Sequence, residues 1–206
     1  MKQLSTYITE GLKIGKKYRQ NKTYNYHSKD CDELRKIIEK LLKERGENAD
    51  LNDIDVSEIT DMSQLFCGLD PHNIDISEWD VSNVKDMSYM FYNCKQFNSD
   101  LSEWDVSNVT TTRDMFFNCK QFNSDLSDWD VSNVTDMYRM FYDCKNFNSD
   151  LSEWDVKKVI DMDKMFYGCE EFNQYLDQWD TKKLKYKANM FKNCDSLKNI
   201  PSWYKE

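Results

Sequence analysis

A repeat of 25 residues constrains the fold of this chain more than any other feature of its sequence. Tryptophans recur at this interval from Trp79, phenylalanines from Phe66 and cysteines from Cys94. Six copies run from about Ile54 to the C-terminus. One unit of this size cannot bury its own apolar side, but neighbours stacked about 4.8 Å apart share a continuous core. The repeats are therefore expected to stack into an elongated array.

The spacing of apolar residues within one unit predicts short strands and short helices. Trp104 and Val106 alternate with polar residues, as expected of a strand. Val134, Met137 and Phe141 follow the spacing of a helix. A period of about 20–29 residues with this rhythm is typical of leucine-rich-type repeats. We therefore predict an α/β solenoid of short parallel strands and short helices, similar to leucine-rich-repeat proteins, over residues 49–206.

Residues 30–48 are predicted to form an amphipathic helix that caps the first unit. Asp30 and Glu33 have the spacing of a capping box, and Gly46 is a helix stop. A partner-binding helix is the alternative to a capping helix. Residues 1–29 are predicted to form a basic, flexible leader. The apolar stripe of the helix comprises Leu34, Ile37, Ile38, Leu41 and Leu42.

The last copy becomes polar, as a C-terminal cap should. Lys187 stands where most earlier copies have a core Met, and Pro201 interrupts the pattern. The six copies, with this cap, are expected to occupy residues 49–206.

Composition and charge exclude several classes of protein. Aromatic residues make up 14% of the chain, which contains 5 glycines and 2 prolines, so neither a disordered nor a collagen-like chain is expected. The net charge is +5 over residues 1–48, −16 over 49–156 and +2 over 157–206, which sum to −9. Because the acidic middle repels phosphates, we do not expect a nucleic-acid partner.

Two absences bear on localisation. The longest apolar run is too short to span a membrane. The first ten residues lack the apolar centre of a secretory signal. We therefore expect a protein in the cytoplasm of the producing cell or on a virion, which would reach the cell surface only by a non-classical route.

The sequence shows no pattern typical of catalysis. Its two histidines, His27 and His72, lie near no repeated Ser or Cys, and there is no Gly-rich phosphate loop. The 7 cysteines include no C-x-x-C pair, which favours a column of buried, reduced thiols over disulfides or a zinc site. We expect no catalytic residue, no cofactor, no metal ligand and no enzymatic activity.

An acidic surface is the candidate binding site. One Asp per unit lies between the Trp and Val positions, and another acidic residue precedes the Trp. Like charges about 5 Å apart repel by about 0.8 kcal/mol in water, which favours a basic or polar protein partner. The alternatives are carboxylates that cap turns and keep the surface soluble, or bound calcium. The predicted protein-binding residues are Asp80, Glu103, Asp105, Asp128, Asp130, Glu153 and Asp155.

A column of aromatic residues directly follows the repeated phenylalanines. Adjacent residues of a helix point about 100° apart, so burial of the phenylalanines leaves these rings partly exposed. The column is either a contact strip or a set of rings that pack between neighbouring units. Its members are Tyr92, Phe117, Tyr142 and Tyr167.

One motif links the chain to a known family. The pattern Cys-x-x-Phe-Asn-x-Asp-Leu-Ser-x-Trp-Asp-Val-Ser-Asn-Val-x-x-Met-x-x-Met-Phe-x-x-Cys covers roughly residues 51–200. It resembles the leucine-rich-type repeat of BspA-like bacterial surface proteins and of mycoplasma surface lipoproteins, and similar repeats occur in phage and viral proteins. The resemblance implies a right-handed solenoid used for adhesion or protein–protein contact.

Three hypotheses about function follow. The first is a non-enzymatic protein-interaction module that uses the acidic surface. The second is a phage-encoded structural or host-interaction protein that docks through the leader, and the third is a cell-surface adhesin. The sequence predicts neither the identity of the partner nor the oligomeric state.

Overall fold

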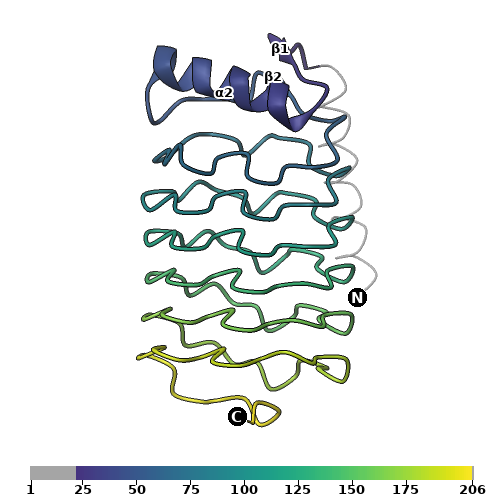
Figure 1. The fold of residues 1–206 in the computed structure, drawn as a ribbon, viewed down its shortest axis with the longest axis vertical. Coiled ribbons are helices and arrows are strands. Elements are labelled where there is room, and N and C mark those ends of the chain that lie inside the picture. The colour runs from purple at the N-terminus through teal and green to yellow at the C-terminus, as the bar shows by residue number, and fades with distance from the viewer. Residues whose placement is uncertain (1–21, 206) are drawn as a thin grey trace, which may run out of the picture.

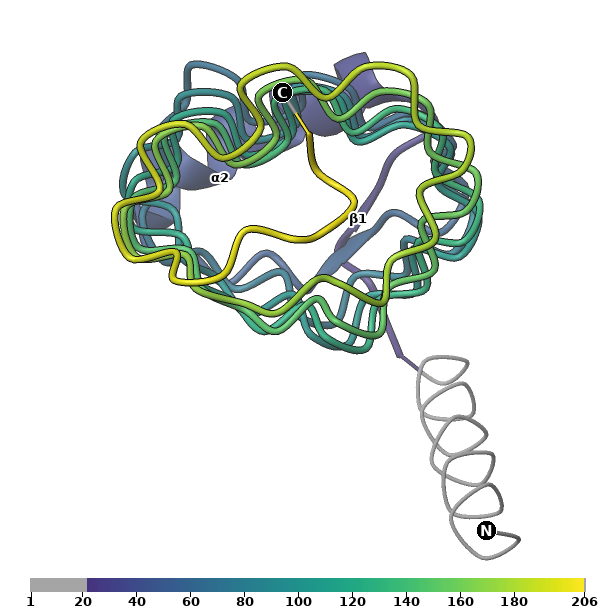
Figure 2. The ribbon, with the colours of Figure 1, turned by 90° about the horizontal axis from the view of Figure 1, so that it is seen from below.

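The protein is a stack of similar coils, described for residues 22–205 in a computed structural model. Each coil lies beneath the previous one, from the N-terminal helix at one end to the C-terminus at the other (Figure 1). Seen along the stack, the coils superpose as an oval ring (Figure 2). The predicted leader falls largely on residues 1–21, which lie outside the described residues.

Regular secondary structure is confined to the N-terminal end of the described residues. Strand β1 (Tyr26–His27) pairs in parallel with β2 (Ile54–Asp55), and helix α2 (Cys31–Arg45) lies between them in the chain. The other coils are joined by single parallel bridges at intervals of 25 residues, such as Asp86 with Thr111 and Thr111 with Asp136. The described coils therefore keep the period of the sequence.

The short strands and helices predicted for each unit are replaced by tight turns. Hydrogen bonds from residue i to residue i−3 follow one another, as from Trp104 N to Leu101 O at 3.2 Å and from Met90 N to Met87 O at 3.2 Å. Tyr89 and Asn93 have left-handed backbone angles, with φ of 59° and 63°. A residue with left-handed backbone angles at every fourth position stops a helix from continuing. Apolar residues that are spaced as in a helix therefore lie on successive turns here.

Phenylalanine rings fill the interior in two files that run along the stack, beside the buried tryptophans. The repeated phenylalanines stack with centroids 5.5 Å apart between Phe91 and Phe116, and 5.6 Å apart between Phe116 and Phe141. Phe122 packs against Phe116 at 4.0 Å within the same coil. All four rings are fully buried. Such pairs contribute about 0.5–1.5 kcal/mol each beyond the burial of their area.

Polar groups of the core side chains bind the coil before them. The indole Nε1 of Trp129 donates to Leu101 O at 3.0 Å, and Trp104 and Trp154 repeat this bond one coil away on either side. The thiol of Cys144 donates to Phe116 O at 2.8 Å. Burial strongly raises the pKa of Cys119 and Cys169, whose thiols make the same bond. Four of the five cysteines in the predicted column are buried, and Cys194 is half-buried.

Helix α2 covers the end of the stack, where its apolar stripe meets the first coil. Its side chains Leu34, Ile38 and Leu41 are fully buried. Asp30 caps the helix by accepting a hydrogen bond from Glu33 N at 2.8 Å, and Gly46, at φ 85°, ends it with an N–H bond to Leu42 O. Asp30 and Gly46 therefore begin and end the helix, as predicted from the sequence.

The same helix supplies hydrogen-bond donors that a preceding coil would otherwise provide. In each inner coil a backbone N–H binds a carbonyl of the next coil, as from Phe91 N to Met115 O at 2.9 Å. The first coil has no coil before it, so its carbonyls need other donors. Arg35 donates to Leu65 O at 3.0 Å and Cys67 O at 2.9 Å, and the Cys31 thiol donates to Ser63 O at 3.5 Å. The helix therefore satisfies polar groups as well as covering apolar ones.

The last residues of the predicted flexible leader, 22–29, contact the first coil, so the predicted boundary at residue 29 is wrong. Residues 22–29 lie beside the first coil, where Asn25 N donates to Asp53 O at 2.9 Å and β1 pairs with β2. Arg45 binds the Asp53 carboxylate at 2.8 Å, and hydrogen bonds from Arg45 lower the pKa of Asp53 to about 2. Asp53 thus links the segment before α2 to the helix that follows it.

The C-terminal coil closes the stack less completely. Lys187, at the position of a core Met, extends to donate to Trp203 O at 3.1 Å. The indole of Trp203 donates to Leu176 O at 2.8 Å, as the other tryptophans do to their preceding coils. Tyr186 and Ile200 remain exposed here. Assignment of the stack to the right-handed leucine-rich-repeat class remains a prediction.

Candidate functional site

The predicted acidic residues lie on one side of the stack, beside the buried tryptophans. This side continues from β2, which carries Asp55 at the equivalent position of the first coil. Glu103 and Asp105 flank Trp104 and are exposed, and Asp128 and Asp130 flank Trp129 in the same way. The structure therefore brings Asp80, Glu153 and Asp155 into the same surface through their equivalent positions in other coils. We call this surface the acidic side.

The aspartates of this side cap turns, as one sequence alternative proposed. Asp105 Oδ1 accepts hydrogen bonds from Ser107 N at 3.1 Å and Ser107 Oγ at 2.6 Å. Asp130 Oδ1 accepts from Ser132 N at 3.0 Å. In another column, hydrogen bonds from Ser127 lower the pKa of Asp125, which keeps that carboxylate charged. These aspartates therefore hold the backbone of each coil in its turn.

The remaining acidic residues have few cationic partners. Among residues 22–205, Glu103, Asp128 and Glu153 form no ion pair. The equivalent Glu78 is paired with Lys22, which comes from the segment before α2. The acidic side therefore carries uncompensated negative charge on its middle coils, and a lysine is already bound at its N-terminal end.

Aromatic and basic side chains gather on the opposite side, under α2. Arg35 of α2 binds carbonyls of Leu65 and Cys67, which places this helix over the coil segment that carries the aromatic column. The rings of Tyr92 and Phe117 stack at 4.6 Å. The same stacking continues to Tyr142 at 4.6 Å and to Tyr167 at 4.7 Å. The rings pack between coils, as one alternative predicted, and they are half-exposed.

Two arginines beside these rings were not identified from the sequence. The guanidinium of Arg113, from the preceding coil, lies 4.0 Å from the centroid of Tyr138, and that of Arg139, the next residue in the chain, lies 4.6 Å from it. Arg139 also lies 5.1 Å from the Phe117 ring. The sequence signal that could have identified both arginines is that their positions differ between coils that are otherwise nearly identical. We call Tyr92, Phe117, Tyr142, Tyr167, Arg113 and Arg139 the aromatic–arginine strip.

Two carboxylates form ion pairs with these arginines. Asp114 is fully buried, and Arg139 Nε lies 2.8 Å from its Oδ1. Arg113 Nη1 donates to Asp136 Oδ2 at 3.0 Å, and its Nε lies 3.8 Å from Asp114 Oδ2. Burial raises the pKa of Asp114, and the charges of Arg139 and Arg113 oppose that rise. The charges of the two arginines are therefore balanced by Asp114 and Asp136.

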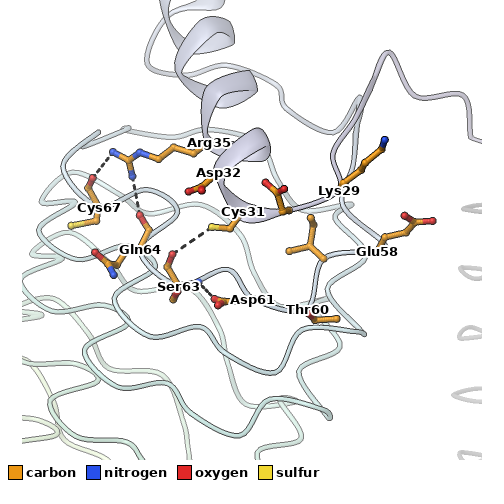
Figure 3. A pocket seen from close by; sticks show the side chains of 12 residues that line it. Lys29, Cys31, Asp32, Arg35, Glu58, Thr60, Asp61, Ser63, Gln64 and Cys67 are labelled. Carbon is orange, nitrogen blue, oxygen red and sulfur yellow. Dashed lines mark hydrogen bonds between the residues drawn. The ribbon is translucent and has the colours of Figure 1, made fainter.

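A polar pocket of about 620 Å³ lies between the start of α2 and the first coil. Figure 3 shows Cys31 and Arg35 pointing from α2 toward the carbonyls of Ser63, Gln64 and Cys67. Burial raises the pKa of Cys31 to about 11, and the nearby Asp61 adds to that rise. The polar groups that line the pocket join α2 to the first coil.

The histidines lie apart from one another. His27 is 3.2 Å from Asp55 and His72 is 3.0 Å from Glu47. Within residues 22–205, no group of three or more His, Cys, Asp or Glu side chains is arranged to hold a metal ion. In the same part of the chain, no helix is long and apolar enough to cross a membrane.

Comparison with known proteins identifies a family. A search of curated proteins and a search of solved structures each give no match. A family model described as "Mycoplasma protein of unknown function, DUF285" matches residues 34–141 and again residues 115–206. Together the two matches extend from α2 through all the coils to the C-terminus. The chain therefore belongs to this Mycoplasma family, DUF285.

Proposed function

We propose that this protein is a non-enzymatic protein-interaction module whose acidic side binds a basic partner. The observation that carries the proposal is the column of Glu103, Asp128 and Glu153, which are exposed and form no ion pair among residues 22–205, on a stack with a continuous buried core. Adjacent carboxylates about 5 Å apart repel by about 0.8 kcal/mol in water, and a basic partner would relieve that repulsion. The Lys22–Glu78 pair is an example of the contact that such a partner would make.

The resemblance to BspA-like surface repeats supports the same proposal. Each coil exposes one acidic segment. A partner with regularly spaced basic side chains could therefore bind several coils at once. A cell-surface adhesin is the second candidate, because the repeats that this chain resembles occur in BspA-like surface proteins and mycoplasma surface lipoproteins. The two candidates differ in location and share the same binding surface.

A triple charge reversal tests the acidic side. We expect Glu103→Lys, Asp128→Lys and Glu153→Lys together to weaken binding to immobilised poly-L-lysine by about tenfold or more, because three exposed pairs at about 0.2–1 kcal/mol each are lost and become repulsive. These positions are chosen because their side chains are exposed, whereas Asp105 and Asp130 also hold turns. Biolayer interferometry at fixed ionic strength would measure the change.

The matched control reverses three acidic residues elsewhere. Glu44, Glu171 and Asp195 are exposed and lie off the acidic side, so their triple Lys variant changes the net charge equally. We expect it to bind poly-L-lysine within about twofold of the wild type. Equal weakening by both triple variants would show that only net charge matters, and would contradict a binding surface on the acidic side.

A further inference from the structure

We propose that residues 1–21 bind the acidic side of the same chain and compete there with a basic partner. The inference rests on the proposed function, because it names the segment that occupies the binding surface when no partner is bound. Residues 1–21 themselves lie outside the described residues. Three observations support the proposal: the course of the described chain that leads to them, the spacing of their basic residues, and the charges of the segment and the surface.

The described segment before α2 already lies along the acidic side. The side-chain amide of Asn25 donates to the carboxylate of Asp53 at 2.8 Å. Three residues earlier, Lys22 forms an ion pair with Glu78, which occupies in the second coil the position that Asp53 occupies in the first. Only 18% of the Lys22 side chain is exposed, so it lies against the coil. Followed toward the N-terminus, the chain therefore crosses from one coil to the next in three residues.

The same step of three residues continues into residues 1–21. The carboxylates at the position of Glu78 in the following three coils are Glu103, Asp128 and Glu153. The residues found at steps of three before Lys22 are Arg19, Lys16 and Lys13. Each further carboxylate of the column thus has a basic residue at the matching step. Lys17 adds a fourth cation to this stretch, which contains no acidic residue.

The segment is long enough to reach the whole column. Three coils spaced about 4.8 Å apart place Glu153 about 14 Å beyond Glu78. The chain from Lys22 back to Lys13 can span up to about 30 Å. Lysine and arginine carry their charges on long side chains, so pairing tolerates small differences between the two spacings.

Charge complementarity favours the same occupant. Residues 1–21 contain 5 basic residues and 1 acidic residue. The equivalent segments of the acidic side carry net charges of −2, −3, −3 and −1 in chain order, and these segments are 73–85, 98–110, 123–135 and 148–160. In the last coil the equivalent segment, 173–185, has a net charge of +1, so the attraction ends there. A tethered segment also has an effective concentration in the millimolar range, which favours it over a basic segment of another molecule.

Carbodiimide cross-linking of the full-length protein tests the contact directly, because the reagent joins an amine to a carboxylate only where the two meet. We expect peptide mass spectrometry to find Lys13 or Lys16 joined to Asp128 or Glu153, beside a Lys22–Glu78 link that serves as the positive control. A mixture of unlabelled and 15N-labelled protein separates links within one molecule from links between molecules. Absence of these links, or links formed only between molecules, would overturn the proposal.

Neutral substitutions in the full-length protein test the competition. We expect the leader variant to bind poly-L-lysine about fivefold more tightly than the wild type, because the probe no longer has to displace residues 1–21 from their exposed ion pairs. In the background of the triple acidic-side reversal, the same substitutions should change binding by less than twofold. The leader variant carries Lys13→Gln, Lys16→Gln, Lys17→Gln and Arg19→Gln.

A matched control removes the same charge from exposed positions off the acidic side, and it should bind poly-L-lysine within about twofold of the wild type. It carries Lys36→Gln, Lys43→Gln, Lys95→Gln and Lys192→Gln. Unchanged binding by the leader variant, or equal tightening by the leader variant and this control, would overturn the competition while leaving the acidic side as a binding surface. Absence of poly-L-lysine binding by the leader variant would contradict the proposed function itself, and this inference with it.

Discussion

Replacing Phe116 by Ala should lower the free energy of unfolding by about 3–5 kcal/mol, the range expected for loss of a buried aromatic side chain. Its ring is fully buried and contacts Phe91 and Phe141 in the neighbouring coils, at 5.5 and 5.6 Å, and Phe122 at 4.0 Å. The substitution therefore leaves a cavity in the middle of the stack and removes the ring contacts with both neighbouring coils. Urea unfolding followed by tryptophan fluorescence would measure the change, since Trp129 lies 6.5 Å from the Phe116 ring.

The adjacent residue supplies the control for this substitution. Phe117 is half-exposed and stacks on Tyr92 and Tyr142 at the surface. We expect Phe117→Ala to cost only about 1–2 kcal/mol, because two surface ring pairs are lost without a deep cavity. Similar losses from Phe116→Ala and Phe117→Ala would contradict the placement of the two columns.

Replacing Ile38 by Asp should detach helix α2 and destabilise the first coil by about 3–5 kcal/mol, because the new carboxylate would be buried without a partner. Ile38 is fully buried between α2 and the first coil. Release of the helix would also remove the donors from Arg35 to the carbonyls of Leu65 and Cys67. The loss would appear as reduced helical circular dichroism, since Cys31–Arg45 is the only α-helix among residues 22–205.

Lys36→Asp is the matched control for this substitution. Lys36 lies two residues away on the exposed face of the same helix. We expect it to change the free energy of unfolding by no more than about 0.5 kcal/mol, as is usual for surface positions. A stable, fully helical Ile38→Asp variant would show that α2 does not cap the stack through its apolar stripe.

The sequence predicts the period, the interior files and the capping helix, because all three depend on strong local signals. Trp104, Phe116 and Cys119 are buried as their regular spacing requires. Asp30 and Gly46 bound α2 because an N-cap carboxylate and a left-handed glycine act within a few residues.

The shape of each coil could not be predicted from the same signals. Apolar residues in a tight turn recur at nearly the same spacing as in a helix, so periodicity does not distinguish the two. The left-handed backbone angles of Tyr89, Asp114 and Arg139 make these segments successive turns instead of helices. Tyr and Arg disfavour that conformation, whereas Asp adopts it more readily, and the neighbouring Met and Phe side chains are packed in the core on either side of these turns.

The candidate sites, too, could be predicted from the sequence only in part. Repetition predicts the acidic column, but it does not reveal that Asp105 and Asp130 hold turns while Glu103 and Asp128 are free of ion pairs among the described residues. The Arg113 and Arg139 cluster depends on contacts across 25 residues between unlike side chains. No periodic signal marks such contacts, because they occur where the repeat departs from its pattern.

Native-state alkylation of the cysteines tests the central claim most directly, since each coil must bury its thiol against the coil before it. The thiolate is the reactive form, and burial raises the pKa of Cys94 and Cys194 to about 12 and that of Cys119 still more strongly. With iodoacetamide at about pH 8, followed by peptide mass spectrometry, we expect Cys67 to be labelled first and Cys94, Cys119, Cys144 and Cys169 to stay protected until the protein is unfolded. Equal labelling of all seven cysteines in the native protein would contradict a stack of coils that share one interior.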